Sequence, residues 1–197
     1  MSSSSTCTFP SPRGHELSAR LERPSGAPIG TAIFAHCFTC SKDLRVVRRL
    51  TSSLTDQGFA VLSFDFTGLG HSEGDFVEST FTADVQDLIA AAEYLAQTIA
   101  PPSLLVGHSL GGAAVRAAAP DLPSVKAVAT IAAPADPAHV RKIFDGDIDA
   151  IIRDGSAPAT IAGRTFTVGL SFLEDLEKLQ PLKALARFKG ATLILHS

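Results

Sequence analysis

The stretch Leu104-Leu105-Val106-Gly107-His108-Ser109-Leu110-Gly111-Gly112 contains the pattern Gly-x-Ser-x-Gly directly after a short apolar run. The apolar residues indicate a buried strand, and the Ala-rich residues 110–119 that follow favour a helix, which Pro120 would end. Glycines two residues before and after Ser109 suit a sharp strand-to-helix turn, because a Cβ atom there would collide with neighbouring backbone. Such a turn lifts a serine hydroxyl out of the sheet and is called a nucleophile elbow. We therefore predict a turn that presents Ser109 as a nucleophile.

Length and composition bound the class of protein. The chain has 197 residues, 45% of them hydrophobic, which is enough for one domain with a large core; we expect residues 1–197 to form a single domain. The net charge is −3 and the pI is ≈ 6.0, so no basic surplus favours binding to nucleic acid or to an anionic membrane. Small molecules are the expected partners.

The N-terminus and the cysteines bear on location and cofactors. Residues 1–6 are polar and lack the apolar segment of a secretory signal, and no apolar run approaches the ~20 residues of a membrane span. Three cysteines, an odd count without a disulfide framework, favour a reducing compartment, and we expect the cytoplasm. The spacing Cys37-x-x-Cys40 fits either a thiol redox pair or two half-buried thiols in a loop. A zinc site needs about four ligands and a second pair is missing, so we predict no metal and no cofactor.

The rest of the chain alternates between strand and helix patterns. Continuous apolar runs predict buried strands at residues 31–35, 59–64, 103–106, 125–133 and 191–195. Helical spacing predicts helices that begin near Ser41, where the serine would cap the helix, near Thr82 and at Leu110. Alternation of apolar and polar residues over 15–22 predicts a half-exposed strand at a sheet edge. These elements together predict an α/β fold with a mostly parallel sheet flanked by helices.

Residues 136–180 break this alternation. Charges rise there, strand-like runs shorten, and residues 144–153 and 172–179 have the pattern of short helices. We interpret the segment as a small lid insertion over the catalytic edge of the sheet.

Three segments together resemble a known family. His36-Cys37-Phe38, Asp65 to Gly74 and Gly107 to Gly112 have the order and spacing of the α/β-hydrolase fold, nearest its serine aminopeptidase and monoacylglycerol-lipase-like branch. Residues 36–43 resemble more specifically bacterial hydrolase domains that are fused to a C-terminal domain of the osmotically inducible protein C type. The resemblance covers residues 36–197 and implies a fused C-terminal domain. It departs from the family at Cys37, because the family usually has His-Gly at that point.

The chemistry of acyl transfer gives each segment a role. A serine hydroxyl needs a histidine base, a carboxylate that orients this base, and hydrogen-bond donors for the oxyanion. The backbone N–H of Leu110 follows the nucleophile and is the first expected donor, and the resemblance implies the N–H of Phe38 as the second. We expect His36 to support this loop, and Gly107 and Gly111 to support the turn.

The acid and the base are not evident in the chain. Asp136 follows the strand after the elbow, where a minority of α/β-hydrolases carry the acid, so it is an alternative orienting carboxylate. His108 points away from Ser109 in such a turn, and neither His139 nor His196 matches the position of the family's base. The strand at residues 191–195 resembles the one that precedes the acid loop in the family. We therefore expect the acid and the catalytic histidine to lie beyond residue 197, the fold to be truncated at its C-terminus, and a sheet edge to be exposed.

Two functions are compatible with these features. The first is a serine hydrolase that acts through Ser109 on an ester, thioester or amide with an apolar acyl group. The second is a non-catalytic hydrolase-like module of a bifunctional stress-response protein. Ser109 and its loops favour the first function, and the missing base favours the second.

Overall fold

The computed structural model describes residues 2–138, 145–146, 148–161, 163–176, 178 and 180–196, with only the backbone of residues 145 and 146. Its main element is a sheet with seven strands, built from β1 (Ser3–Pro10), β2 (Glu16–Arg23), β3 (Gly30–Ala35), β4 (Phe59–Phe64), β5 (Leu104–His108), β6 (Ala127–Ile131) and β10 (Ala191–Leu195). Their order is β1-β2-β4-β3-β5-β6-β10. The strands from β4 to β10 run parallel, and β1 and β2 are antiparallel to their neighbours. The predicted α/β fold with a mostly parallel sheet is confirmed.

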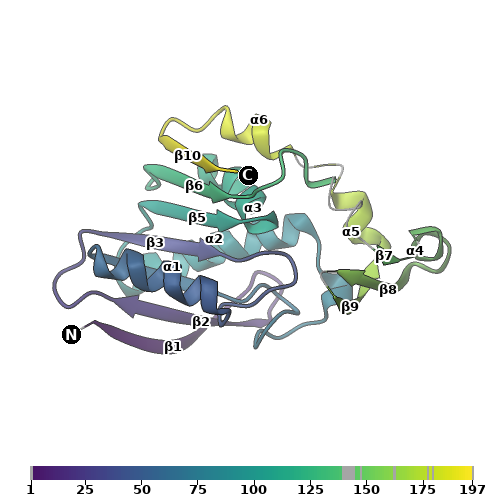
Figure 1. The fold of residues 1–197 in the computed structure, drawn as a ribbon, viewed down its shortest axis with the longest axis horizontal. Helices are drawn as coiled ribbons and strands as arrows, with labels where there is room; N and C mark the ends of the chain where they lie inside the picture. The colour runs from purple at the N-terminus through teal and green to yellow at the C-terminus, as the bar shows by residue number, and fades with distance from the viewer. Residues whose placement is uncertain are drawn as a thin grey trace.

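Helices cover both faces of this sheet. They are α1 (Arg45–Asp56), α2 (Phe81–Thr98), α3 (Leu110–Ala118) and α6 (Pro181–Leu185), with short 3-10 turns η1 (Phe76–Glu78) and η2 (Ala119–Asp121). In Figure 1, α1 lies in front of the sheet, and α2 and α3 lie behind it. Alternate side chains of β3 and β5 serve the two faces: Phe34 and Val106 pack toward α1, whereas Ile33 and Leu105 belong to the larger core on the α2 and α3 side. No helix in the described part of the chain combines the length and the apolar character that a membrane crossing requires.

Two local predictions were wrong. The strand expected at an edge, β2, lies inside the sheet between β1 and β4, because residues 3–10 form a further strand. That strand was missed because its residues are mostly polar and show no apolar run. In the structure most of them are exposed, and Phe9 is the one buried residue of the strand. Ser41 does not cap α1, whose N-cap residue is Leu44 and makes no side-chain cap bond. Gly58 follows the C-terminal cap residue of α1 with φ +95°, a conformation that favours glycine.

A second, three-stranded antiparallel sheet forms within the segment that we interpreted as a lid insertion. It consists of β7 (Asp145–Gly146), β8 (Ser156–Ile161) and β9 (Arg164–Gly169), accompanied by α4 (Ile148–Asp154) and α5 (Leu170–Asp175). The two helices overlap the two predicted short helices, although the start of the first prediction, residues 144 and 147, lies outside the described residues. Strands β8 and β9 were not predicted. Their apolar side chains pack against α3 and Phe38. Figure 1 shows the small sheet and its two helices beyond the carboxyl ends of the parallel strands.

Two buried carboxyl groups lie at the start of α2, next to this small sheet. Asp87 accepts hydrogen bonds from the N–H and the hydroxyl of Thr67, at 2.9 and 2.8 Å, and its Oδ2 lies 3.7 Å from Nη2 of Arg13. Burial raises the pKa of Asp84 well above its usual value, and the charge of Asp87 raises it further, whereas Arg13 and a hydrogen bond from Ser79 lower it. Asp84 therefore retains a proton at a pH where an exposed aspartate is ionised.

Replacing Asp84 with asparagine is expected to raise the melting temperature by about 2–4 °C at pH 8, which corresponds to roughly 1 kcal/mol. Because the folded-state pKa of Asp84 is raised, its contribution to stability is complete below the unfolded-state pKa of about 3.9 and is lost as the pH rises through the folded-state pKa. Asparagine has nearly the same shape and no proton to lose, so the difference should vanish near pH 4. Thermal unfolding at several pH values measures this, with the exposed Glu93→Gln on the same helix as an unchanged control. A lower melting temperature of Asp84→Asn at pH 8 would show that the folded protein needs the ionised carboxylate.

Candidate active site

The turn between β5 and α3 holds Ser109 in an unusual conformation. Ser109 has φ +53° and ψ −124°, and among the described residues other than glycine only Ala132 shares a positive φ. Such a conformation is disfavoured for L-residues and persists only where surrounding contacts determine it. Here the N–H of Ser109 donates to the carbonyl of Ile131 at 2.9 Å, and its own carbonyl accepts from the N–H of Gly112 at 2.9 Å. The backbone of Ser109 is thus held between β6 and the first turn of α3.

Gly107 and Gly111 allow the two arms of this turn to touch. A Cβ atom on Gly107 would lie 2.4 Å from the carbonyl oxygen of Gly111, and one on Gly111 would lie 2.2 Å from the carbonyl oxygen of His36. Both distances are far below van der Waals contact, and the neighbours are backbone atoms that cannot move aside. The start of α3 therefore rests directly against the end of β3 as well as β5.

The two residues expected to donate to an oxyanion lie on either side of this contact. Helix α3 begins at Leu110, whose N–H is one of the first N–H groups of a helix and has no acceptor within the helix. Phe38 lies in the β3–α1 loop (residues 36–44), within a turn in which the N–H of Cys40 donates to the carbonyl of Cys37 at 3.0 Å. The side chains of Phe38 and Leu110 are buried in one apolar cluster. The structure thus places both residues beside the turn that carries Ser109.

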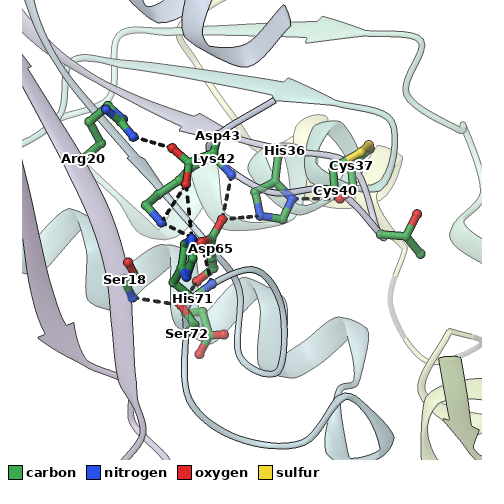
Figure 2. Close-up of polar contacts among 12 residues, drawn as sticks. Ser18, Arg20, His36, Cys37, Cys40, Lys42, Asp43, Asp65, His71 and Ser72 are labelled. Carbon is green, nitrogen blue, oxygen red and sulfur yellow. Dashed lines mark hydrogen bonds and ion pairs between the residues drawn. A yellow bond between two sulfur atoms is a disulfide. The ribbon is translucent and has the colours of Figure 1, made fainter. Parts of the chain in front are cut away.

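His36 braces the first part of the β3–α1 loop. Its ring is almost fully buried, and its Nδ1 donates to the carbonyl of Cys37 at 2.7 Å. Its Nε2 faces the carboxylate of Asp65, at 3.6 Å from Oδ1, and has no hydrogen-bond partner. In Figure 2 the ring stands between Cys37 of this loop and Asp65. His36 therefore lies between the β3–α1 loop and Asp65, and it supports the loop from inside the protein.

Asp65 is the centre of the polar network in Figure 2. Its carboxylate accepts from the backbone N–H of Lys42 at 2.6 Å, from the ammonium of Lys42 at 2.7 Å and from the backbone N–H of His71 at 3.0 Å. Burial by itself would raise the pKa of Asp65, but His36, Lys42 and the N–H of His71 outweigh this effect and hold the pKa well below its usual range. Asp65 is therefore a fully buried anion that joins the β3–α1 loop to the loop after β4.

The loop after β4 is shaped around the same carboxylate. Gly70 has φ +57°, and a Cβ atom there would lie 2.2 Å from Oδ2 of Asp65. The hydroxyl of Ser72 donates to the carbonyl of Asp65 at 2.6 Å and accepts from the N–H of Ser18 at 2.8 Å. The glycine-rich segment that carried part of the family resemblance therefore serves to enclose Asp65.

Helix α5 and strand β9 of the inserted segment each contact the β3–α1 loop. The ring of Phe38 stacks on that of Phe172 from α5, with centroids 4.6 Å apart. Nη1 of Arg164, from β9, donates to the carbonyl of Thr39 at 2.7 Å, and its guanidinium lies over the ring of Phe166. Residues far apart in the sequence thus hold both central residues of the turn at positions 37–40.

Among the described residues, neither Asp136 nor a histidine makes a hydrogen bond with the hydroxyl of Ser109. His108 ends β5 and is half-buried; burial lowers its pKa, and the positive field of His36 lowers it further. Asp136 is exposed and accepts from the N–H of Ala138 at 2.9 Å, in a local turn. His196 follows the edge strand β10, and His139 lies outside the described residues. In the part of the chain that the structure describes, the hydroxyl of Ser109 makes no hydrogen bond with a histidine.

The structure joins Cys37 and Cys40 by a disulfide, with Cα atoms 5.2 Å apart. The expectation of a chain without a disulfide was therefore wrong, because the turn at positions 37–40 brings the two side chains together. Cys7, on β1, is free. Within the described ranges, no three His, Cys, Asp or Glu side chains are grouped so that they could hold a metal ion.

Sequence reasoning missed two contributors to this site. Lys42 lies within residues 36–43, for which sequence reasoning provided only a family resemblance, and nothing in the sequence signals that its ammonium is buried against Asp65. Arg164 belongs to a strand that was not predicted. The contacts of Lys42 with Asp65 and of Arg164 with Thr39 join residues that are distant along the chain, so neither contact produces a local sequence pattern.

The comparison with known protein families covers the loops described above. Residues 32–194 match the model of the alpha/beta hydrolase family. The chain belongs to this family. The β3–α1 loop, the loop after β4 and the turn at Ser109 all lie within the matched part of the hydrolase.

Solved structures of similar proteins extend the comparison. The esterase domain of a Rhodothermus marinus protein is 45% identical over 98% of this chain and 76% of its own, with a TM-score of 0.77. A serine hydrolase without a lid from Xanthomonas campestris is 27% identical over 67% of this chain and 62% of its own, with a TM-score of 0.60. Est1E from Butyrivibrio proteoclasticus, solved with ferulic acid, is 20% identical over 96% of this chain and 78% of its own, with a TM-score of 0.83, and shows the fold alone. No curated protein matches this hydrolase significantly in sequence.

Replacing Asp65 with asparagine is expected to lower the free energy of unfolding at pH 7 by about 3–5 kcal/mol, because it removes the buried counterion of Lys42 and leaves its ammonium with only the partly exposed carboxylate of Asp43, at 3.5 Å. Since the folded-state pKa of Asp65 is lowered, its stabilisation is complete above the unfolded-state pKa of about 3.9 and is lost progressively as the pH falls from there through the folded-state pKa, so the loss should be smaller at pH 3 than at pH 7. Urea unfolding at pH 7 and at pH 3 measures both effects.

The matched control is Asp43→Asn in the same network. Asp43 pairs with Arg20 and, at 3.5 Å, with the ammonium of Lys42, but it is one-third exposed and leaves Lys42 its closer partner Asp65, so its replacement should cost only about 0–1 kcal/mol. Equal losses for the two variants, or a loss for Asp65→Asn that is no smaller at pH 3 than at pH 7, would contradict the assignment of Asp65 as the central anion.

Proposed function

We propose that this protein is a serine hydrolase that cleaves carboxylic esters through an acyl-enzyme at Ser109. The observation that carries the proposal is the backbone of Ser109, which keeps a disfavoured positive φ at the junction of a parallel strand and a helix. Strain of this kind is retained at sites where a side chain must be presented in one direction. The similarity to the Rhodothermus esterase domain supports an ester substrate among the esters, thioesters and amides that the sequence allows.

The reaction has two steps. The Ser109 oxygen attacks the substrate carbonyl carbon while a base takes the hydroxyl proton, and the N–H groups of Leu110 and Phe38 donate to the oxyanion that forms. The carbon–oxygen bond to the leaving alcohol then breaks, and the base returns the proton to that alcohol. Water repeats the sequence on the acyl-enzyme and releases the acid. Arg164 and Phe172, which contact the loop of Phe38, help to keep its N–H in place.

The substrate's acyl group is proposed to be apolar. Phe38 contacts Phe76 and Phe172, and Phe76 contacts Phe166, with ring centroids 4.6–5.1 Å apart. These rings join the β3–α1 loop to the small antiparallel sheet, which we propose as the lid. A substrate carbonyl placed at the oxyanion donors would lie next to this aromatic surface, where apolar groups are favoured over charged ones.

The acid and the base are proposed to lie in a segment C-terminal to β10. None of the described histidines hydrogen-bonds with Ser109, and β10 forms one edge of the parallel sheet with Leu193, Ile194 and Leu195 about half exposed. An apolar strand at an open edge is suited to pair with a further strand. About a quarter of the Rhodothermus esterase domain has no counterpart in these residues, which supports the same view. Asp136 remains the alternative acid.

Other features remain predictions from the sequence. They are the branch within the family, the fused C-terminal domain of the osmotically inducible protein C type, the cytoplasmic location and the small-molecule partner. The non-catalytic module remains the competing function.

Ser109 is expected to be the residue that a fluorophosphonate probe modifies, because its oxygen is the proposed nucleophile. Intact-mass measurement and peptide mapping, on a native chain that continues past residue 197 and so includes the proposed base, would locate the label. Ser109→Ala should abolish labelling, while Ser53→Ala, which removes an exposed hydroxyl on α1, should leave it unchanged. Labelling at another residue, or no labelling of the native chain, would favour the non-catalytic module instead.

Residues 1–197 alone are expected to hydrolyse p-nitrophenyl butyrate at least about 10³-fold more slowly than a chain that continues past residue 197, because a nucleophile without its base loses most of its rate enhancement. Steady-state kcat values of both chains, each with its Ser109→Ala control, measure this. Full Ser109-dependent turnover by residues 1–197 would refute the proposal and would place the base on a histidine within them, with Asp136 as its partner.

A further inference from the structure

A disulfide encloses the residue that carries the second proposed oxyanion donor. Cys37 and Cys40 are bonded to each other, and Phe38 lies between them. Both cysteines are half-buried, whereas Phe38 between them is buried. Figure 2 shows the disulfide at the end of the network that runs through His36 to Asp65.

Noncovalent contacts hold the flanks of this turn. His36 donates to the carbonyl of Cys37, and the N–H of Lys42 donates to Asp65 on the other side. Across the turn itself, one backbone bond from Cys40 to Cys37 accompanies the disulfide. The disulfide is therefore the covalent restraint on the short segment whose backbone must direct the N–H of Phe38 toward the substrate.

We propose that Cys37 and Cys40 form a reversible thiol–disulfide site that controls the oxyanion loop, with the disulfide form as the more active state. This inference rests on the proposed function, because it concerns the donor at Phe38. It differs from a catalytic dithiol: the pair does not reduce a substrate of the hydrolase but changes the geometry of the hydrolytic site.

The exchange balances with a dithiol reductant. One thiolate of the reductant attacks a sulfur of the Cys37–Cys40 bond, which breaks and forms a mixed disulfide. The second thiol of the reductant then displaces the protein sulfur. The protein gains two electrons and two protons as two thiols, and the reductant becomes a cyclic disulfide. A small-molecule disulfide such as oxidised glutathione reverses the change by the same steps.

Loss of the bond acts on the reaction through distance. Two thiols cannot stay at bonding distance, so the side chains of Cys37 and Cys40 must separate, and the turn between them must adjust. Complete loss of one oxyanion donor costs about 10²–10³ in kcat, and a displaced donor costs part of that. We expect reduction to lower kcat by about 10-fold with a much smaller change in KM, because the oxyanion exists in the transition state and not in the bound ester.

The experiment compares the oxidised and the reduced form of a chain that continues past residue 197, under identical conditions. Alkylation of free thiols followed by mass measurement establishes the state of Cys37 and Cys40. The rate constant for fluorophosphonate labelling of Ser109 reports acylation even where turnover is slow, and p-nitrophenyl butyrate gives kcat and KM. Reduction with dithiothreitol should lower both the labelling rate and kcat by about 10-fold, and oxidised glutathione should restore them.

Variants separate this effect from general damage by the reductant. Cys37→Ser combined with Cys40→Ser should be slow and insensitive to dithiothreitol, with a melting temperature that shows a folded protein. Cys7→Ser, which removes the free cysteine on β1, should respond like the native chain.

The outcomes distinguish the two proposals. Equal Ser109 labelling in both redox states, faster labelling after reduction, or a pair that dithiothreitol does not reduce would overturn the redox proposal and leave the proposed function intact. Absence of Ser109 labelling in both states would reject the proposed function and the redox control with it.

Discussion

The close contact between the first turn of α3 and the ends of β3 and β5 is the constraint on which the rest of this structure depends. It exists because neither Gly107 nor Gly111 has a Cβ atom: one would meet backbone at 2.4 Å and the other at 2.2 Å. The contact places the start of α3 beside the β3–α1 loop and leaves Ser109 with a positive φ. A side chain at either glycine would push the helix away from the sheet and separate the two proposed oxyanion donors.

The buried carboxylate of Asp65 provides the second level of organisation. It accepts hydrogen bonds from the loop before α1 through Lys42 and from its own loop through the N–H of His71. A buried ion pair contributes little net stability against an apolar alternative, but loss of one partner is costly. Its value here is geometric, since it ties the β3–α1 loop to β4 from the inside while His36 and the disulfide act on the same loop from the other end.

The small antiparallel sheet adds a contribution from a distant part of the chain. Phe172 contacts the ring of Phe38, and Arg164 donates to the carbonyl of Thr39. The turn between the cysteines is therefore held by the inserted segment as well as by the network around Asp65. A donor that is fixed before the substrate binds costs no reorganisation during the reaction. The proposed lid, the disulfide and the carboxylate network thus all contact the β3–α1 loop. A change in any of them is expected to displace the N–H group of Phe38.

The sequence by itself determined the parallel strands of the central sheet, the turn at Ser109 and the family. Buried parallel strands appear as continuous apolar runs, such as residues 59–64 and 191–195, and the turn needs glycines at fixed spacing, so both are local patterns. Only the tertiary structure decided that β2 is internal, that Lys42 is buried against Asp65, that Cys37 bonds to Cys40, and that Arg164 reaches Thr39. The strand pairing, the ion pair and the Arg164 bond join residues separated along the chain, and the disulfide requires a turn whose shape is set by its neighbours. The Cys-x-x-Cys spacing is compatible with a bonded pair and with two free thiols, and the other contacts leave no periodicity or spacing in the sequence, because their geometry exists only once the chain has folded.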